Sequence, residues 1–150
     1  MTITIRIGDP LSAEGRALLS ESQAFMASVY AEEENFALTT EALAAPGILF
    51  LIAEEAGRAL GCAALVIKAG YGEIKSMYVS PGGRGAGAGT ALMAALEAHA
   101  KAAGLSCLRL ETGPELDAAV RLYERHGFQR RGPFGDYPDV PGSRFMEKPL

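Results

Sequence analysis

A glycine-rich loop near the middle of the chain carries the clearest chemical signal in the sequence. Residues 79–90 read Val-Ser-Pro-Gly-Gly-Arg-Gly-Ala-Gly-Ala-Gly-Thr and connect an expected strand directly to an expected helix. Small residues let the backbone approach a ligand closely, and the free N–H groups and the dipole at a helix start favour a phosphate. Arg84 adds a charged donor at the edge of the loop. The loop therefore predicts a pyrophosphate-binding site rather than a turn that needs glycine only for steric reasons.

Two known kinds of phosphate-binding loop fit this segment poorly. A Walker-type loop requires Lys and then Ser or Thr after its last glycine, but Ala88 and Gly89 stand there. A dinucleotide fingerprint can be traced at Gly83, Gly85 and Ala88, with an acid downstream at Glu111. The loop follows an antiparallel hairpin, however, and too little chain remains for several further βα units. The dinucleotide interpretation therefore stays a weak alternative.

A third kind of loop matches better. Arg84-x-x-Gly87-x-Gly89 resembles the [Gln/Arg]-x-x-Gly-x-[Gly/Ala] coenzyme A loop of the GNAT superfamily of N-acetyltransferases. Three further stretches resemble that family's preceding strand, the start of its helix and its Leu-Tyr-Glu-x-x-Gly-Phe signature: residues 77–81, 92–96 and 122–128. Two motifs in the right order are more specific than either alone. The tail at 133–148, with residues 72–77, is similar to a branch of small bacterial GNAT proteins whose acceptor is mostly unassigned.

The resemblance implies an enzyme that moves an acetyl group from acetyl-CoA directly to the amine of a bound small molecule or peptide. Two splayed strands, 71–79 and 105–111, would hold the pantetheine between them, and a backbone N–H near Tyr78 or Val79 would polarise the thioester carbonyl. The cofactor contacts that it implies are Met77, Tyr78, Val79, Arg84, Gly85, Ala86, Gly87, Ala88, Gly89 and Thr90.

Three residues are candidates for proton transfer. The motif implies that Tyr123 donates a proton to the departing thiolate, since a phenol with a pKa near ~10 stays protonated at neutral pH. An ammonium acceptor must lose a proton first, and Glu73 and Glu111 are the candidate bases, because burial in an apolar strand raises a carboxyl pKa. Glu73 ranks slightly first, since relatives often use an acid on that strand. Each also has a structural reading: Tyr123 as a packed ring, and the two acids as solvated side chains.

The acceptor is expected to contact the early part of the chain. Tyr30, Glu34 and Asn35 lie where relatives line the acceptor pocket, and Asp136 and Tyr137 in the tail could close it. GNAT proteins often form homodimers, so the resemblance also allows a homodimer here, although the sequence does not determine the oligomeric state.

A non-catalytic acyl-CoA sensor or regulatory module is the alternative function. Many relatives have an Asn seven residues before the motif Tyr, where it contacts the cofactor, and Leu116 stands there in this chain. That departure favours a sensor, whereas Tyr123 favours the enzyme, because a sensor needs no proton donor.

The elements that must position these residues follow from hydrophobic periodicity and turn residues. Strands are expected at 2–7, 48–53, 60–67, 71–79, 105–110, near 128 and, as an edge strand, at 145–148. Helices are expected from residue 10 with an apolar face through Val29, at 40–45, at 87–103 and at 116–126. Within the third helix, Leu92, Leu96 and Ala103 share one face. The pattern predicts a mixed α/β (α+β) GNAT-like sheet of six to seven strands with flanking helices, an antiparallel first half and one parallel crossover.

Composition and charge limit the classes of protein to which the chain could belong. A chain of 150 residues with 49% apolar and 21% charged residues is typical of one globular domain, here 1–150. A net charge of -4 without a Lys/Arg run argues against nucleic acid, and no apolar run reaches the ~18 residues of a membrane span. Cys62 and Cys107 are expected to be buried free thiols, and two His with two Cys predict no metal site. With no signal-like start, a cytoplasmic protein is expected.

Overall fold

The computed structural model describes residues 2–29, 36–113 and 117–150. Its strands are β1 (Thr4–Ile7), β2 (Ile48–Glu55), β3 (Arg58–Ile67), β4 (Gly72–Val79), β5 (Cys107–Thr112), β6 (Gln129–Arg131) and β7 (Arg144–Pro149). Its helices are α1 (Ala13–Val29), α2 (Thr40–Leu43), the short 3₁₀ helix η2 (Pro81–Gly83), α3 (Ala88–Ala102) and α4 (Asp117–Arg125).

All seven strands form one mixed sheet with the order β1-β2-β3-β4-β5-β7-β6. Neighbouring strands from β1 to β4 pair antiparallel, and β4 pairs parallel with β5. The expected α/β fold, with its antiparallel first half and single parallel crossover through α3, is therefore confirmed.

The expectation of an edge strand at 145–148 is wrong. β7 lies between β5 and β6, where Met146 pairs with Leu110 on one side and Arg130 on the other. Met146 is fully buried, as an inner strand requires. The edge strand on this side of the sheet is β6, which is short and has the sequence Gln-Arg-Arg. Charged residues on an edge strand protect it from pairing with another chain.

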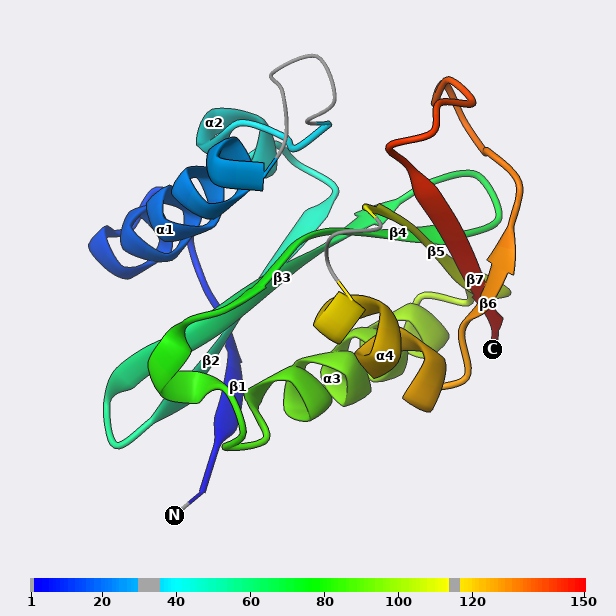
Figure 1. The fold of residues 1–150 in the computed structure, drawn as a ribbon. Coiled ribbons are helices and arrows are strands. Elements are labelled where there is room, and N and C mark those ends of the chain that lie inside the picture. Colours follow the sequence, from blue (N-terminus) through cyan, green and yellow to red (C-terminus); the bar gives the residue numbers. More distant parts are fainter. Residues whose placement is uncertain (1, 30–35, 114–116) are drawn as a thin grey trace.

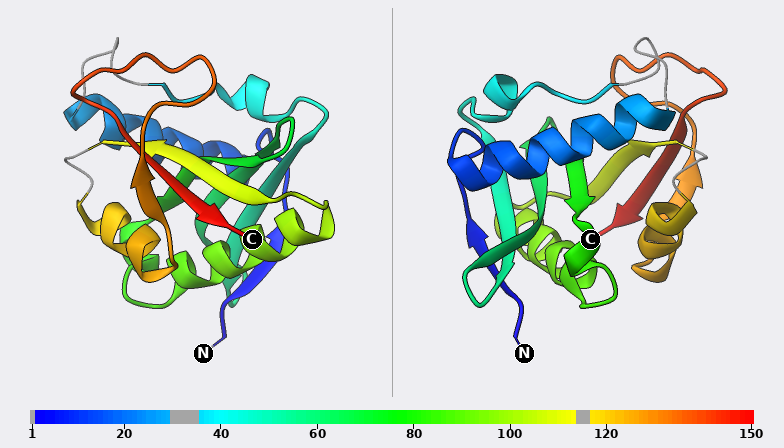
Figure 2. Two further views of the ribbon diagram at one scale, coloured as in Figure 1. Left: turned by 90° about the vertical axis from the view of Figure 1, so that its right-hand side faces the viewer. Right: turned by 60° about the vertical axis from the view of Figure 1, so that its left-hand side comes forward.

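Helices cover both faces of the sheet (Figures 1 and 2). Figure 1 shows α1 and α2 on one face, and α3 and α4 on the other. Each pair covers its own cluster of buried side chains: Leu18, Leu19 and Leu43 lie in the first, and Leu92 and Leu96 in the second.

Two predicted helix faces are only partly buried. On α3, Leu92 and Leu96 are buried as expected, but Ala103 is exposed because the helix ends at Ala102 and the chain then turns away at Gly104. On α1, Phe25 and Val29 remain 39% and 37% exposed. The apolar cluster beneath α1 includes only Leu18 and Leu19 from that helix, so the described part of the chain does not cover its last turns.

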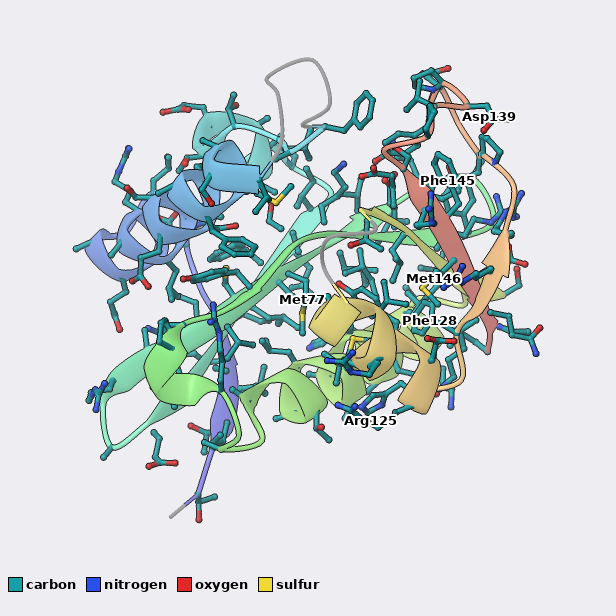
Figure 3. The ribbon with its side chains drawn as sticks, in the orientation of Figure 1. Met77, Arg125, Phe128, Asp139, Phe145 and Met146 are labelled. Atoms are coloured by element: carbon teal, nitrogen blue, oxygen red, sulfur yellow. The ribbon has the colours of Figure 1, made fainter. Side chains whose placement is uncertain are left out.

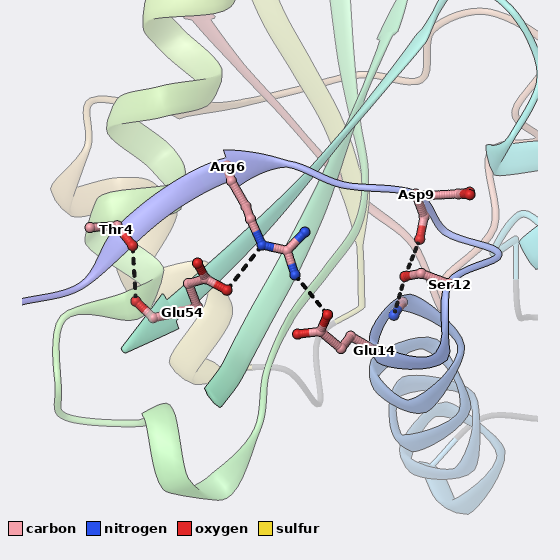
Figure 4. A network of polar contacts seen from close by, with 7 residues as sticks. Thr4, Arg6, Asp9, Ser12, Glu14 and Glu54 are labelled. Carbon is pink, nitrogen blue, oxygen red and sulfur yellow. Dashed lines mark hydrogen bonds and ion pairs between the residues drawn. The ribbon is translucent and has the colours of Figure 1, made fainter. Parts of the chain in front are cut away.

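Polar contacts connect the first strand to its neighbours (Figure 4). Arg6 pairs with Glu54 of β2 at 2.9 Å and with Glu14 of α1 at 3.0 Å. The Ser12 hydroxyl accepts a hydrogen bond from the backbone N–H of Gly15 at 3.1 Å, which is an N-cap interaction at the start of α1.

The two cysteines differ in burial. Both are free thiols, but Cys62 is buried whereas Cys107 is partly exposed, so the expectation of two buried thiols holds for only one of them. Burial raises the pKa of the Cys62 thiol to about 12. Among the described residues, no helix is long and apolar enough to cross a membrane, and no group of three or more His, Cys, Asp or Glu side chains is placed to hold a metal ion.

Candidate active site

The parallel pair β4–β5 comes apart halfway along β4. The two strands pair only at Gly72, Glu73 and Ile74 of β4, although β4 continues to Val79. At Ser76 the backbone has a positive φ of 54°, and the register with β3 shifts at the same place. A bulge of this kind bends a strand and redirects its side chains. One edge of β4 beyond Ile74 therefore lacks the ladder partner that the other edge retains in β3.

A cavity of about 100 Å³, here called the central cleft, lies where these strands separate. It brings Met77 of β4, Glu111 of β5 and Tyr123 of α4 to one place, although they are distant in sequence. Figure 3 shows Met77 beside the first turns of α4. The remaining lining residues include Ser22, Met26, Phe36, Lys75, Ser76, Thr112 and Gly142.

The glycine-rich loop ends in an uncapped helix. Gly87 is the N-cap of α3 and has a left-handed backbone with φ 92° and no side chain to cap the first turn. The first N–H groups of a helix have no intrahelical acceptor, so those at the start of α3 remain available to a ligand. Arg84 is exposed beside them, and its Nε donates to the carbonyl of Val79 at 3.1 Å. An open, positively polarised helix start next to a guanidinium fits a pyrophosphate.

The two sequence motifs meet in space. A Cβ placed on Gly89 of the loop would lie 3.1 Å from Leu122, the first residue of the second motif. Glycine therefore lets α3 and α4 approach closely, and Tyr123, the next residue of α4, lines the central cleft. The two motifs are therefore in contact in the folded chain, although they are far apart in the sequence.

Tyr123 is deeply buried. Its side chain is 5% exposed and packs against Phe128, with ring centroids 5.8 Å apart. Burial, and secondarily the charge of Glu111, raises the pKa of the Tyr123 phenol above its ordinary value. Among the described residues, its hydroxyl has no hydrogen-bond partner, so it remains available to whatever fills the cleft.

Glu111 shares the cleft with Tyr123. Ser143, a buried residue, donates its hydroxyl proton to the Glu111 carboxylate at 2.7 Å. Burial raises the pKa of Glu111, and the hydrogen bond from Ser143 and the charge of Lys75 partly offset that increase. A carboxylate with a raised pKa is a better proton acceptor near neutral pH than a solvated one.

Glu73 lies in a separate, larger cavity of about 320 Å³, here called the outer pocket. It is 5% exposed and accepts a 2.5 Å hydrogen bond from the Tyr137 hydroxyl. The Lys75 ammonium donates to the same hydroxyl at 2.6 Å and to the backbone carbonyl of Phe36 at 3.0 Å. Burial lowers the pKa of Lys75 and raises that of Tyr137. Phe36 and Lys75 line both cavities, so the two spaces adjoin.

The structure thus separates some of the predicted residues and unites others. Tyr123, Met77 and Glu111 border the central cleft, whereas Glu73, Asp136 and Tyr137 border the outer pocket. Tyr78 and Val79 end β4, and the Tyr78 hydroxyl donates to Glu21 of α1 at 3.2 Å. The remaining candidates, Tyr30, Glu34, Asn35 and Leu116, lie outside the described residues.

Lys75, Ser76 and Ser143 line or support these cavities but were not predicted. For Lys75 a signal existed, since it lies two residues from Glu73 in a strand and so shares its face. Ser76 reaches the cleft only through the bulge, which the sequence does not reveal, and its hydroxyl is buried without a partner in the described part of the chain. Ser143 depends on the pairing of β7 with β5, which is equally non-local.

Comparisons with known proteins match this chain to acyltransferases each time. The model of the acetyltransferase (GNAT) family matches residues 16–128. A protein of Azospirillum brasilense named IAA acetyltransferase is 43% identical over 150 residues, which cover 99% of this chain and 98% of the relative. A solved chain from Klebsiella pneumoniae, described as an acyl-CoA N-acyltransferase, is 37% identical with a TM-score of 0.84, over 99% of this chain and 97% of that one.

A more distant structure shows the same fold with a ligand. The acetyltransferase yncA from Salmonella typhimurium, solved with its cofactor acetyl-CoA, has a TM-score of 0.73 at 23% identity and covers 100% of this chain and 95% of that one. The family match spans most of the chain, and the Azospirillum brasilense and Klebsiella pneumoniae matches span nearly all of it. The chain therefore belongs to the GNAT family and is an acetyl-CoA-dependent N-acetyltransferase.

Proposed function

We propose that residues 1–150 act as one catalytic domain that acetylates the amino group of a small molecule, with donor and acceptor bound together. The observation that carries this proposal is the junction of the two cavities at Phe36 and Lys75. An amine entering from the outer pocket can reach a group held in the central cleft without leaving the protein. Direct transfer needs only this proximity.

The donor site is assigned to the loop and the free edge of β4. Beyond Ile74, the backbone groups of Met77, Tyr78 and Val79 that face away from β3 have no strand partner in β5, and they would pair with the amides of the pantetheine arm. The N–H groups of Gly85 and of Gly87 to Thr90, with the Arg84 guanidinium, would hold the pyrophosphate; the N–H groups of Arg84 and Ala86 already donate to Pro81 and Gly83. When bound, acetyl-CoA supplies the thioester whose carbonyl carbon the amine attacks.

Tyr123 and Glu111 are the proposed proton-transfer pair. Tyr123 would protonate the departing thiolate, because its raised pKa keeps the phenol protonated at neutral pH. Glu111 would take a proton from the acceptor ammonium, directly or through water. Because Glu73 lies in the outer pocket and is bonded to Tyr137, we assign it to acceptor binding. This reverses the slight preference for Glu73 that the sequence suggests.

A panel of amines tests the proposal. The release of free thiol from acetyl-CoA is measured with single small amines and with short peptides that have a free N-terminus, and mass spectrometry identifies the acetylated product. We expect amine-dependent release with at least one small amine. Release that does not depend on amine would show hydrolysis instead, and acetylation restricted to the peptides would contradict the small-molecule assignment.

A further inference from the structure

We propose that the outer pocket selects an amine that carries its own carboxylate on an apolar or aromatic body, as a free amino acid with an apolar side chain does. The proposal rests on the proposed function and deepens it by naming the acceptor class. Three features of the pocket support it: its walls, the free donor of Lys75, and the balance of charges around it.

The walls of the outer pocket are largely apolar and aromatic. Phe36, Leu38, Val66, Tyr71, Tyr137 and Pro138 line it. The rings of Phe36 and Tyr137 meet edge to face with centroids 5.6 Å apart, so they form a rigid corner. A flat or branched apolar group packs favourably against such a surface.

Lys75 offers an unfilled donor where the two cavities meet. An ammonium has three protons to donate, and Lys75 gives two of them to Tyr137 and to the carbonyl of Phe36. Within the described part of the chain it has no further acceptor, and the nearest carboxylate oxygen there, on Glu73, lies 3.8 Å away, which is beyond hydrogen-bonding distance. The Lys75 side chain is only 11% exposed, so little water can satisfy the third proton. A carboxylate on the ligand would complete its hydrogen bonds.

The charges in the outer pocket suit a zwitterion. Lys68 also lines the pocket, has no ion pair among the described residues and adds to the lowering of the pKa of Lys75. Glu73 and Asp136 supply the opposite sign. A ligand ammonium that points from this pocket into the central cleft would approach Glu111, and its carboxylate would lie near the lysines. A simple amine would leave the Lys75 donor open, and a ligand with two negative charges would be repelled by the acids.

One arrangement satisfies all three features. The apolar side chain occupies the outer pocket, the carboxylate lies against Lys75 at the junction, and the amino group points into the central cleft towards Glu111. In a peptide N-terminus, a neutral amide replaces that carboxylate. The pocket should therefore discriminate against peptides in favour of free amino acids.

Matched acceptor pairs test the inference. The kcat/KM is measured for L-phenylalanine against L-phenylalaninamide, and for L-leucine against L-leucinamide, because each pair differs only in the carboxylate. We expect the acid to be preferred by about 10-fold or more, the scale of one charge-assisted hydrogen bond. Equal rates, or a preference for the amides, would overturn the inference while leaving the acetyltransferase assignment intact.

Two lysine variants locate the preference. Lys75→Gln should abolish it, and Lys68→Gln should reduce kcat/KM for the acids more than for the amides. Lys101→Gln, on the exposed surface of α3, is the matched control and should behave as wild type. Acetyl-CoA binding and the melting temperature of each variant show that it is folded. If Lys68→Gln and Lys75→Gln, once folded, kept the full preference, the carboxylate site would lie elsewhere and the inference would be wrong.

A binding measurement separates this inference from the proposed function. With CoA present, N-acetyl-L-phenylalanine should raise the melting temperature more than N-acetyl-L-phenylalaninamide does. A carboxylate-dependent shift supports the pocket assignment even if the acids are turned over slowly. The absence of any shift with the carboxylated product would overturn the assignment, whichever amines the enzyme acetylates.

Discussion

At the residue scale, the site depends on two ionisable groups whose surroundings change their chemistry. Tyr123 is buried and packs against Phe128, so its proton is held more firmly than in a free phenol. Glu111 is buried in the same cleft, and Ser143 keeps its carboxylate in one orientation. The proposed proton donor and the proposed proton acceptor therefore border one small space, which suits a transfer from ammonium to leaving thiolate.

Tyr123→Phe should separate catalysis from packing. The variant keeps the ring against Phe128 and removes only the hydroxyl, so acetyl-CoA affinity should stay within a few-fold. If the hydroxyl is the proton donor, kcat should fall on the order of 10²-fold, the usual scale for one positioned acid. Steady-state rates with an established acceptor, and binding measured separately, decide the matter. Full kcat in the variant would show that the thiolate takes its proton from water.

Glu111→Gln should change the pH dependence of the rate. The base must be unprotonated to act, and burial raises the pKa of Glu111, so the wild-type rate should rise with pH through a midpoint above the ordinary Glu value of ~4.3. In Glu111→Gln this acidic limb should disappear and the rate should be low throughout. In Glu73→Gln the limb should remain while the acceptor KM increases. The opposite result would return the role of base to Glu73.

Glu111 also affects stability with a definite sign. Because its pKa is raised in the folded state, its protonated form favours folding, and this contribution is fully present below the unfolded pKa and is lost as pH rises through the folded pKa. The charged Glu111 therefore costs stability at neutral pH. This is consistent with a residue retained for chemistry rather than for packing.

At the element scale, the start of α3 has a glycine with a left-handed backbone next to helix N–H groups that have no intrahelical acceptor. Gly87 has φ 92° and no atom within 4 Å of where a Cβ would stand, so its glycine is required by backbone conformation rather than by lack of space. At the other end of α3, Gly104 has φ 76° and equally open surroundings. The two positions therefore differ mainly in their distance from the expected phosphate site.

Gly87→Ala and Gly104→Ala form a matched pair. Each substitution forces a residue with a Cβ into the left-handed region, which costs roughly 1–2 kcal/mol of unfolding free energy. Only Gly87→Ala should also weaken acetyl-CoA binding. Gly87 is the N-cap of α3, so its backbone conformation orients the first helix N–H groups towards the expected phosphate site. Denaturant unfolding and calorimetric titration measure the two effects. Equal affinity in both variants would remove the α3 start from the cofactor site.

At the scale of the whole molecule, binding should be linked to folding. The proposed donor site combines β4, α3 and α4, which come together only in the folded chain. A ligand that binds only the folded state raises its stability by mass action. We therefore expect acetyl-CoA to raise the melting temperature in proportion to the logarithm of its concentration, and NADH to leave it unchanged. A shift with NADH and none with acetyl-CoA would contradict the donor assignment.

Local patterns in the sequence were sufficient to predict the elements that form the proposed donor site. The glycine loop before α3, the apolar face at Leu92 and Leu96, and the parallel crossover depend on backbone freedom and helical periodicity within a few turns of chain. The Leu-Tyr-Glu motif likewise places Tyr123 by its position in one helix. The loop, the helix face and the position of Tyr123 in α4 are confirmed because each is determined by residues that are neighbours in sequence, and the parallel crossover is confirmed because the strand-helix-strand order favours it.

Only the tertiary structure decided how the acceptor side is arranged. The insertion of β7 between β5 and β6 brings Ser143 to Glu111, and the bulge at Ser76 opens the cleft. Glu73 and Glu111, equivalent as strand acids in the sequence, lie in different cavities, where Tyr137 donates a hydrogen bond to Glu73 and Ser143 donates one to Glu111. Strand register and the meeting of distant loops are set by the packing of the whole sheet, which no local pattern encodes.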